Sequence, residues 1–529
     1  MTTANANANR QIARAAGTVM LAFLFSQIVG LIRGILVARA FGASSELDAF
    51  LAANQVSETL FNLIAGGALG SAFIPTFTGL LARDERDSAW KLASSIANLV
   101  TLTVSLLALL AFFLAPQLVR YALAPGLAEN AEVFALTISL LRIQLVSAVL
   151  FGLGGLISGI LNAHQIFLIP ALTPAMYQLG IIFGTLVLAP TMGIRGLAWG
   201  VVIGAAAYLL VQVPTLIKHR GIYIPSLGLD NPNVRKVIFL MGPRLLGVAI
   251  VQLNFWVNIW LGSQMDEGSV VGLRYGFSLM LMAQIAIAQS VAIAAMPTFS
   301  AQHALGLVDE MRASLAASLR GVILLALPAS VGLMILREPL ISALYQRGKF
   351  DGEDVRLVSW ALLWYAAGLV GHSIMEILTR AFYARHDTKT PVMIGTIAMG
   401  LNIVFSFLFS WWFEQIGWLP LGGLALANSF ATALEAAALF IFMRKQLNGI
   451  EGKHITRGFV RCAGAALGMA IGLWFWIQAA AEMNRWVIAL GGVALGGLLY
   501  VAGVVIFRVP EVQMMIGALT RRLRRSPSS

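Results

Sequence analysis

The sequence predicts an all-α protein that crosses a membrane many times. Of its 529 residues, 59% are apolar and 11% are charged, and the mean hydropathy is +0.83. Soluble proteins average about 25% charged residues, so this composition excludes a soluble globular fold. The apolar residues form continuous runs about twice as long as a membrane β-barrel strand, without the alternation that such strands need. The runs therefore indicate membrane helices.

About fourteen apolar runs are long enough to cross a bilayer as helices. They span 19–41, 47–81, 92–118, 134–161, 167–188, 196–217, 237–261, 271–296, 315–336, 357–382, 392–413, 419–443, 459–480 and 486–507. The first run is too long for the apolar part of a signal peptide and no cleavage site follows it, so we expect it to stay as a span. The second run is too long for one straight span, and Gly66, Gly67 and Gly70 predict a bend within it.

The distribution of basic residues predicts the orientation. With the N-terminus inside, 24 Lys and Arg lie in inside segments and 8 in outside segments, so we expect both termini in the cytoplasm. The tail at 510–529 carries Arg521, Arg522, Arg524 and Arg525, which predict contact with anionic phospholipids. The net charge of +12 is explained by this topology, and we expect no nucleic-acid partner.

The sequence shows no pattern typical of a catalytic or metal centre. One cysteine, Cys462, excludes an intramolecular disulfide, and the six histidines lack the spacing of a metal site or of a base beside a nucleophile. We therefore expect neither enzymatic activity nor a bound metal or cofactor.

Three short matches recur along the chain at nearly one offset. The paired positions are Pro75 and Pro297, Ala163 and Ala384, and Gly196 and Gly423, at offsets of 222, 221 and 227. Such an offset covers six helices, and because six is even, both copies enter the membrane in the same direction. We expect two parallel six-helix lobes that enclose a cavity and rock to give alternating access. The expected parts are the lobes 1–225 and 226–447, two further helices at 448–509, and the tail.

After the inside and outside assignments, four arginines remain within the spans, where a charge costs about 2.5–3.5 kcal/mol and usually faces protein or a wet cavity. Arg33 lies deep in the first run, and we predict that it binds an anion; the alternative is that it snorkels to the outer interface. Arg244 and Arg274 are further candidates for the same role, with snorkelling as an alternative for both and for Arg142. A guanidinium donates two parallel hydrogen bonds to phosphate, so these residues predict a phosphate-bearing substrate.

Two acidic residues and one amide in the membrane runs have alternative explanations. Asp48 either faces the substrate or caps a helix N-terminus. Glu58 either pairs with Arg33 or relays a proton. Gln252 either contacts the substrate or makes an interhelical hydrogen bond, which is its simplest explanation.

The tenth and twelfth runs carry the remaining membrane carboxylates. Glu376 either pairs with Arg380, four residues further along the helix, or takes part in a proton relay with His372. The other carboxylate is Glu435. The coupling candidates are therefore Glu58, Glu376 and His372.

Several stretches resemble the lipid II flippase family of the MurJ/MviN type, within the multidrug/oligosaccharidyl-lipid/polysaccharide exporter superfamily. They are SQIVGLIRGILVARAFGASSELDAFLAA, GGALGSAFIPTF, GILNAHQIFLIPALTP, LYQRGKFDGEDV and FYARHDTKTPV. The resemblance implies a carrier of lipid II, the undecaprenyl-pyrophosphate-linked glycopeptide, from the inner to the outer leaflet of the bacterial cytoplasmic membrane. It also implies a groove for the lipid tail in the last two helices, and cell-wall synthesis enzymes as possible partners.

The resemblance carries over to individual positions only in part. Arg33 matches the arginine of the family's first helix, and Asp48 matches the acidic residue of its D-A-F motif. The departures are Gln27, Asn62 and Ser278, which stand where members often have arginine, and Gly66, which stands where they often have glutamate. Asn62 is therefore a candidate substrate contact, and Arg274, one turn before Ser278, is a candidate substitute cation.

Other functions remain open from the residues alone. A flippase for another lipid-linked oligosaccharide fits the departures from the family pattern. A cation-coupled exporter of small molecules would need carboxylates rather than arginines in its cavity, so Arg33 argues against it. A scaffold of the cell-wall machinery that no longer transports is a third alternative.

Overall fold

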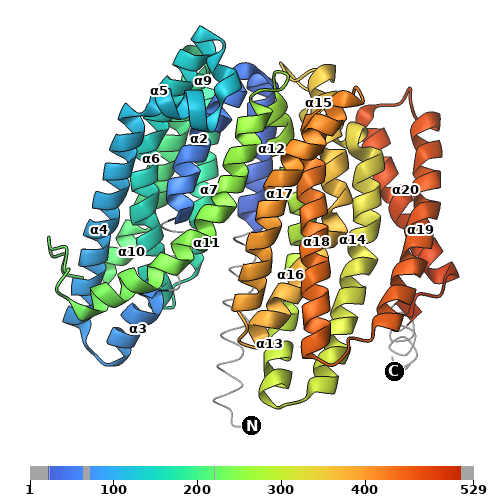
Figure 1. Ribbon diagram of the computed structural model, residues 1–529. Coiled ribbons are helices and arrows are strands. Elements are labelled where there is room, and N and C mark those ends of the chain that lie inside the picture. Colours follow the sequence, from blue (N-terminus) through green and yellow to red (C-terminus); the bar gives the residue numbers. More distant parts are fainter. Residues whose placement is uncertain (1–21, 23, 64–71, 220, 511, 514–529) are drawn as a thin grey trace, which may run out of the picture. The chain divides into compact units, whose positions relative to one another are not determined.

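The computed structural model describes residues 22, 24–63, 72–219, 221–510, 512 and 513 (Figure 1). These residues form helices and contain no strand. Eleven of the helices are long and apolar enough to cross a membrane, and two bent helix pairs raise the number to as many as 13. The predicted bend at Gly66, Gly67 and Gly70 lies outside the described residues. The all-helical membrane fold is thus confirmed, while the number fourteen stays a prediction.

The chain divides into two compact units, of which the first comprises residues up to Val271 together with Arg347–Phe350. Its helices are Leu24–Phe41, α2 (Ser45–Phe61), α3 (Ile74–Ala82), α4 (Arg86–Phe113), α5 (Ala115–Gln117), η2 (Leu118–Leu123), η3 (Pro125–Ala128), α6 (Ala131–Ala163), α7 (Leu168–Phe183), η4 (Gly184–Leu188), α8 (Ala189–Met192), α9 (Ile194–Leu210), α10 (Val213–Lys218) and α11 (Pro232–Gly262). Within this N-terminal unit α2 packs against α6, and α11 contacts both α2 and α4.

Glycines bring α7 and α9 into backbone contact within the N-terminal unit. A Cβ added to Gly180 would lie 2.2 Å from the Cα of Gly204, and one added to Gly184 would lie 2.7 Å from the Cα of Gly200. Small residues four apart allow membrane helices to approach this closely, which increases their van der Waals contact. The packing of these two helices therefore requires glycine at these positions.

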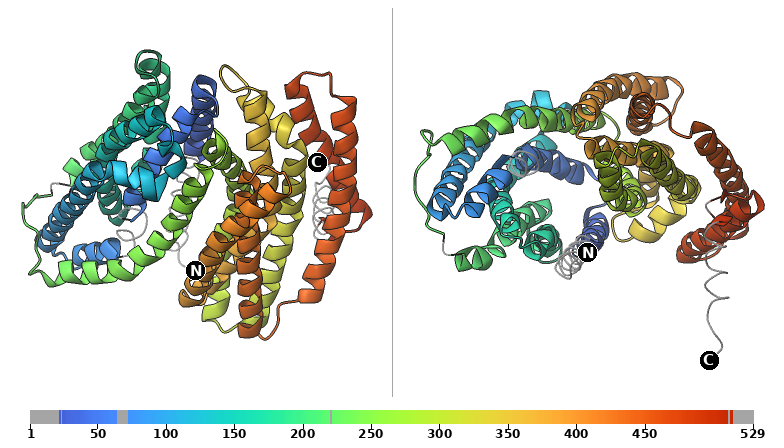
Figure 2. Two further views of the ribbon diagram at one scale, coloured as in Figure 1. Left: turned by 45° about the horizontal axis from the view of Figure 1, so that its top comes forward. Right: turned by 90° about the horizontal axis from the view of Figure 1, so that it is seen from below.

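The second unit comprises Gly272–Gln346 and Asp351–Ser529. Its helices are α12 (Ser269–Gln284, which begins at the boundary), η5 (Ile285–Gln289), α13 (Ser290–Ala304), α14 (Val308–Tyr345), α15 (Gly352–Ala367), α16 (Leu369–Ala384), α17 (Lys389–Gln415), α18 (Leu421–Gln446), α19 (Gly452–Ala479) and α20 (Arg485–Ile506). The last two helices form a hairpin that packs on α14 (Figure 2).

The run predicted at 357–382 is not one straight helix but bends by 45° between α15 and α16. Gly368 lies at the bend, and a Cβ there would come within 2.4 Å of the Ser429 hydroxyl oxygen. That hydroxyl donates a hydrogen bond of 2.6 Å to the carbonyl of Trp364. The approach of α18 thus satisfies a carbonyl near the break, which accounts for the bend.

Backbone geometry supports the predicted repeat. Asp84 and Gly306, 222 residues apart, both have positive φ, at 58° and 71°, and Gln165 and His386, 221 apart, both have φ of 61°. Each of the four turns is closed by a hydrogen bond from the next residue to the carbonyl five positions back. The bonds run from Glu85 to Leu80, Leu307 to Gln302, Ile166 to Leu161 and Asp387 to Phe382. Identical helix-end turns therefore recur at the offset found in the sequence.

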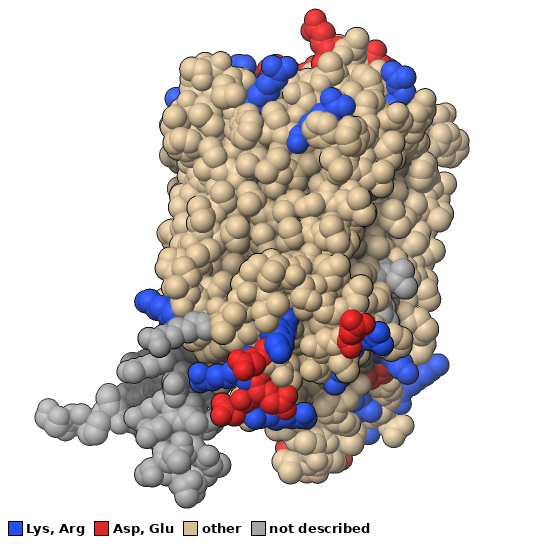
Figure 3. All heavy atoms as spheres, turned by 90° about the vertical axis from the view of Figure 1, so that its left-hand side faces the viewer, with Lys and Arg blue, Asp and Glu red and all other residues tan. Residues whose placement is uncertain are grey.

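Charged side chains are confined to two bands on the face drawn in Figure 3. Lys, Arg, Asp and Glu gather at its two ends, and a broad zone without them lies between. Large apolar side chains are exposed on the helices themselves, including Leu106, Phe113 and Leu498, at 64%, 66% and 70%. Apolar exposure on this scale is explained by lipid rather than water around the helices.

Candidate functional site

Arg33 is the charged residue that the helix Leu24–Phe41 carries near its middle. Its side chain is half-buried and makes no hydrogen bond or ion pair with another residue that the structure describes. The ion pair with Glu58 that the sequence suggested is therefore not formed here. One turn earlier on this helix, a Cβ on Gly30 would lie 3.6 Å from Nε2 of Gln178 on α7. A cation without a protein counter-charge in an apolar helix is suited to an anionic ligand.

Three amide side chains of the N-terminal unit have buried atoms that lack a hydrogen-bond partner among the described residues. The side-chain oxygens of Gln178 and Asn54 are buried and have no hydrogen-bond partner among the described residues, and neither amide atom of Gln144 has one. Buried polar atoms without partners are uncommon in folded proteins and need an explanation, such as water or a ligand. Sequence analysis did not single out these three amides, because a glutamine or asparagine in an apolar run looks the same whether or not its partner is present.

Asp48 is fully enclosed and bonded to the backbone at the start of α12. Its carboxylate accepts hydrogen bonds from the amides of Gly268, at 2.8 Å, and Val271, at 2.9 Å. The side chain is 2% exposed. Of the two explanations that the sequence allowed, the geometry matches the helix N-terminal cap, although the capped helix is α12 rather than the helix that carries Asp48.

The other candidates of the N-terminal unit lie on α2 and α11. Glu58 accepts a hydrogen bond of 2.8 Å from the amide of Asn54, and Asn62 forms the C-cap of α2. Gln252 is buried on α11. Four residues further along α11, Trp256 donates its indole hydrogen bond to Thr59 of α2 at 2.8 Å. Trp256 and Thr59 thus join α11 to the helix that carries Glu58, a contact that sequence analysis missed.

Two of the remaining membrane arginines have partners, unlike Arg33. The side chain of Arg244 lies outside the described residues. Arg142 donates to the carbonyl of Phe112 at 3.2 Å, and its guanidinium carbon lies 4.7 Å from the centroid of the Phe112 ring, so its charge is satisfied locally. Arg274 is half-buried on α12 of the C-terminal unit, and its carbonyl accepts from Ser278 at 2.7 Å. Neither Arg142 nor Arg274 is without a partner.

The membrane carboxylates of the C-terminal unit include one ion pair. Glu376 and Arg380 lie 3.0 Å apart on α16, as the local explanation predicted. His372 is buried one turn before Glu376, and its Nε2 lies 3.1 Å from the side-chain oxygen of Asn428 on α18. Glu435 of α18 is half-buried beside Gly395, where a Cβ would lie 3.2 Å from the carboxylate. The side chain of His372 is thus hydrogen-bonded to α18 rather than to Glu376.

Two motifs that carried the family resemblance form loop contacts. In LYQRGKFDGEDV, the amide of Lys349 donates to the carbonyl of Arg39 at 3.0 Å, and Gly348 has φ of 64°. In FYARHDTKTPV, Asp387 accepts hydrogen bonds from Thr390 and from Gln446 at the end of α18. Partial burial raises the pKa of Asp387, but the bonds from Gln446 and Thr390 outweigh this and leave the pKa below its usual value. Both motifs therefore make hydrogen bonds that fix loops.

Comparison with known proteins identifies relatives over most of the chain. The family model described as "Lipid II flippase MurJ" matches residues 37–490. The lipid II flippase MurJ of Burkholderia cenocepacia is 32% identical over 88% of this chain and 89% of its own length. The probable lipid II flippase MurJ of Vibrio cholerae is 30% identical over 90% and 91% of the two chains.

Solved structures extend the comparison to the fold. A structure of lipid II flippase MurJ in an inward closed conformation aligns with a TM-score of 0.79, at 25% identity, over 94% of this chain and 99% of its own. An inward-facing multidrug resistance MATE family transporter of the MOP superfamily aligns with a TM-score of 0.66 over 81% and 96% of the chains. At 16% identity, the second match shows a shared fold alone.

Proposed function

The chain belongs to the MurJ family of lipid II flippases, and we infer from this membership that it moves lipid II across the membrane. It is a multi-pass membrane protein, and by family it is a transporter. Family membership supports a place in peptidoglycan synthesis, because lipid II is a precursor of that polymer. Catalysis is not part of the function that we propose.

Arg33 is the residue that we propose to bind the substrate's pyrophosphate. The observation that carries this proposal is its position: half-buried in the middle of the helix Leu24–Phe41, without a hydrogen-bond or ion-pair partner among the described residues. A planar guanidinium matches two phosphate oxygens at once.

The other residues predicted from the sequence are proposed to have smaller roles. Arg244, Arg274, Asn62 and Gln252 are proposed as further substrate contacts, and Glu58, Glu376 and His372 as candidates for ion coupling. Asp48 is proposed to act on the substrate site only by holding the start of α12 in place, since its carboxylate is bonded to backbone amides.

The organisation that we propose follows the sequence repeat. The lobes 1–225 and 226–447 would rock around the substrate, and the helices at 448–509 would hold its lipid tail. Both termini would lie in the cytoplasm, with the tail at 510–529 on anionic phospholipid. Cell-wall synthesis enzymes are proposed as partners.

The test is rescue of a bacterium depleted of its own lipid II flippase. Outer-leaflet lipid II is scored with a probe added outside the cells, in strains that express either the unmodified protein or Arg33→Ala. We expect the unmodified protein to rescue and the variant to flip lipid II at least about tenfold more slowly, since a charge-assisted hydrogen bond contributes about 1.5–3 kcal/mol.

Arg39→Ala is the matched control, because Arg39 lies on the same helix but is exposed. Its flipping rate should stay within about twofold of the unmodified protein. Equal loss in both variants would show that Arg33 has no special role. Absence of rescue by the unmodified protein, despite its presence in the membrane, would contradict lipid II as the substrate.

A further inference from the structure

A basic cavity of about 1070 Å³ lies in the C-terminal unit, where α14, α18 and α19 meet. Its charged lining consists of four arginines and one carboxylate, namely Arg312, Arg444, Arg457, Arg461 and Glu451. The loop between α18 and α19 supplies Gly449, Ile450 and Glu451 to its wall. A cavity of this size exceeds what a single inorganic phosphate fills and is large enough for a lipid headgroup.

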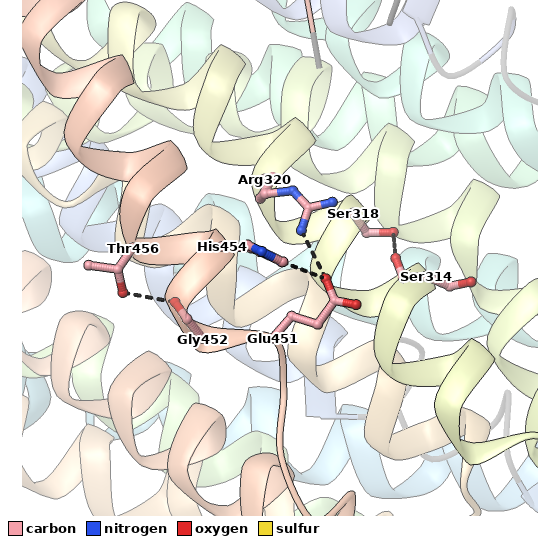
Figure 4. Close-up of polar contacts among 7 residues, drawn as sticks. All are labelled: Ser314, Ser318, Arg320, Glu451, Gly452, His454 and Thr456. Carbon is pink, nitrogen blue, oxygen red and sulfur yellow. Dashed lines mark hydrogen bonds and ion pairs between the residues drawn. The ribbon is translucent and has the colours of Figure 1, made fainter. Parts of the chain in front are cut away.

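Glu451 is already paired with two side chains outside the cavity lining (Figure 4). Its Oε2 lies 3.4 Å from Nη1 of Arg320 on α14 and 3.5 Å from Nδ1 of His454 on α19. The side chain of Arg320 is only 17% exposed, so its charge needs this partner more than an exposed arginine would. The carboxylate therefore does little to neutralise the arginines of the cavity.

Two of the four arginines have no partner for their side chains among the described residues. The side chains of Arg444 and Arg457 are exposed and form no ion pair or hydrogen bond with other residues of the described structure. Arg312 donates to the carbonyl of Leu447 and pairs with Asp309 at 2.6 Å. Arg461 donates to the carbonyl of Arg508 at 2.8 Å, which orients its side chain and leaves its charge uncompensated.

Helix electrostatics explain one of these arginines but not the other. Arg444 lies in the last turn of α18, where the helix dipole favours a cation. Arg457 lies in the second turn of α19, where the dipole gives a cation no such stabilisation. An external anion between α18 and α19 would stabilise Arg457, and the first residues of α19 would favour that anion as well.

The same cavity has apolar walls. Phe440 of α18, Ile450 of the loop and Val460 of α19 line it beside the arginines, and Val460 is 63% exposed. A soluble anion would contact the arginines but would gain nothing from the exposed apolar side chains. An amphiphile can contact both the basic and the apolar parts of the lining. Basic pockets between membrane helices at the cytoplasmic side are suited to anionic lipid headgroups.

We propose that this cavity binds the phosphodiester headgroup of an anionic phospholipid, with Arg444 and Arg457 as its main contacts. The assignment of this lipid to the inner leaflet depends on the proposed orientation of the chain. The proposal that the cavity binds an anionic lipid does not depend on that orientation. This site differs from the basic tail at 510–529, whose predicted lipid contact lies outside the described residues. None of its lining residues is among the proposed contacts of the substrate's pyrophosphate and sugars, although α19 is also one of the helices proposed to hold the lipid tail.

Native mass spectrometry of the purified, delipidated full-length protein tests the proposal. The probes are phosphatidylglycerol, cardiolipin and phosphatidylethanolamine, the last of which has a zwitterionic headgroup, each with and without excess inorganic phosphate. We expect the two anionic lipids to bind at least tenfold more tightly than phosphatidylethanolamine. In Arg444→Gln/Arg457→Gln their affinity should fall about 30-fold, from about 1 kcal/mol per basic residue.

Arg86→Gln/Arg235→Gln is the matched control, because both arginines are exposed and lie in the N-terminal unit. The affinity of this control variant for the anionic lipids should stay within about threefold of that of the unmodified protein, and thermal unfolding checks that all variants are folded.

Equal weakening of lipid binding in both double variants would overturn the proposal, as would binding of phosphatidylethanolamine as tight as that of the anionic lipids. Displacement of the lipids by inorganic phosphate would assign the site to a free anion instead. Lipid II flipping is measured separately, so failure of this proposal and failure of the flippase assignment are distinguishable.

Discussion

Arg33 in the N-terminal unit and Arg380 in the C-terminal unit are both arginines in apolar helical runs, and the structure treats them differently. Arg380 is paired with Glu376 of its own helix at 3.0 Å. Arg33 has neither an ion pair nor a hydrogen bond among the described residues. A charge that is paired within one helix can serve the fold, whereas a charge left unpaired in a membrane helix is a candidate for binding a ligand. The comparison separates a structural cation from a candidate substrate cation.

Asp48 offers the strongest test of this separation, because it is a charged residue of the N-terminal unit with a structural explanation. Asp48→Ala should lower the free energy of unfolding by about 2–5 kcal/mol, since the amides of Gly268 and Val271 would be left buried without acceptors. Asp48→Asn keeps one acceptor oxygen and should lose less. Thermal unfolding of the purified protein measures both variants.

Glu46→Ala is the control for Asp48, because Glu46 is exposed in the same first turn of α2. It should change the unfolding free energy by about 0.5 kcal/mol. An Asp48→Ala protein as stable as this control, but unable to flip lipid II, would place Asp48 among the substrate contacts and blur the distinction between the two kinds of charge.

The pair on α16 gives a second and smaller test. Glu376→Gln should destabilise the protein by about 1–2 kcal/mol, because it leaves the half-buried guanidinium of Arg380 without its carboxylate. The double variant Glu376→Gln/Arg380→Gln should recover part of that loss, and unfolding of the single and double variants gives the coupling energy. Normal stability with a loss of flipping in Glu376→Gln would instead support the ion-coupling hypothesis for Glu376.

The sequence was sufficient to predict an all-helical membrane fold, because lipid requires apolar runs of a minimum length. It was also sufficient to find Arg33, since a charge in such a run is conspicuous by itself. The G-x-x-x-G spacing of Gly180, Gly184, Gly200 and Gly204 was equally visible, yet a sequence does not show which glycine stripes face another helix.

The partners of the charged residues could not be predicted, because they depend on how each helix is rotated about its axis. Asp48 bonds to amides more than 200 residues further along the chain. Arg312 of α14 and Glu451 of the loop before α19 line the same cavity, although they are far apart in the sequence. Such contacts arise from tertiary packing, which local hydropathy does not encode.

The repeated turns give the smallest and cleanest test of how alike the two halves are. Asp84 and Gly306 occupy the same turn at φ of 58° and 71°, and a Cβ on Gly306 would meet no atom within 4 Å. Only backbone conformation therefore distinguishes glycine from other residues there. An L-residue in this region costs about 1–2 kcal/mol, less for Asp, whose side chain bonds locally. Gly306→Ala should thus destabilise by about 1 kcal/mol.

Asp84→Gly should change the free energy of unfolding by less than about 0.5 kcal/mol in the same assay. The relief of positive φ stabilises the folded turn, while the added freedom of glycine stabilises the unfolded chain, and the two effects oppose each other. The ion pair of Asp84 with Arg86, at 3.9 Å between exposed side chains, adds little. Equal effects of the two substitutions would show that the turns share a hydrogen-bond pattern but not the same conformational constraint. A larger loss of stability in Gly306→Ala than in Asp84→Gly would show that one half tolerates a strained aspartate where the other uses glycine.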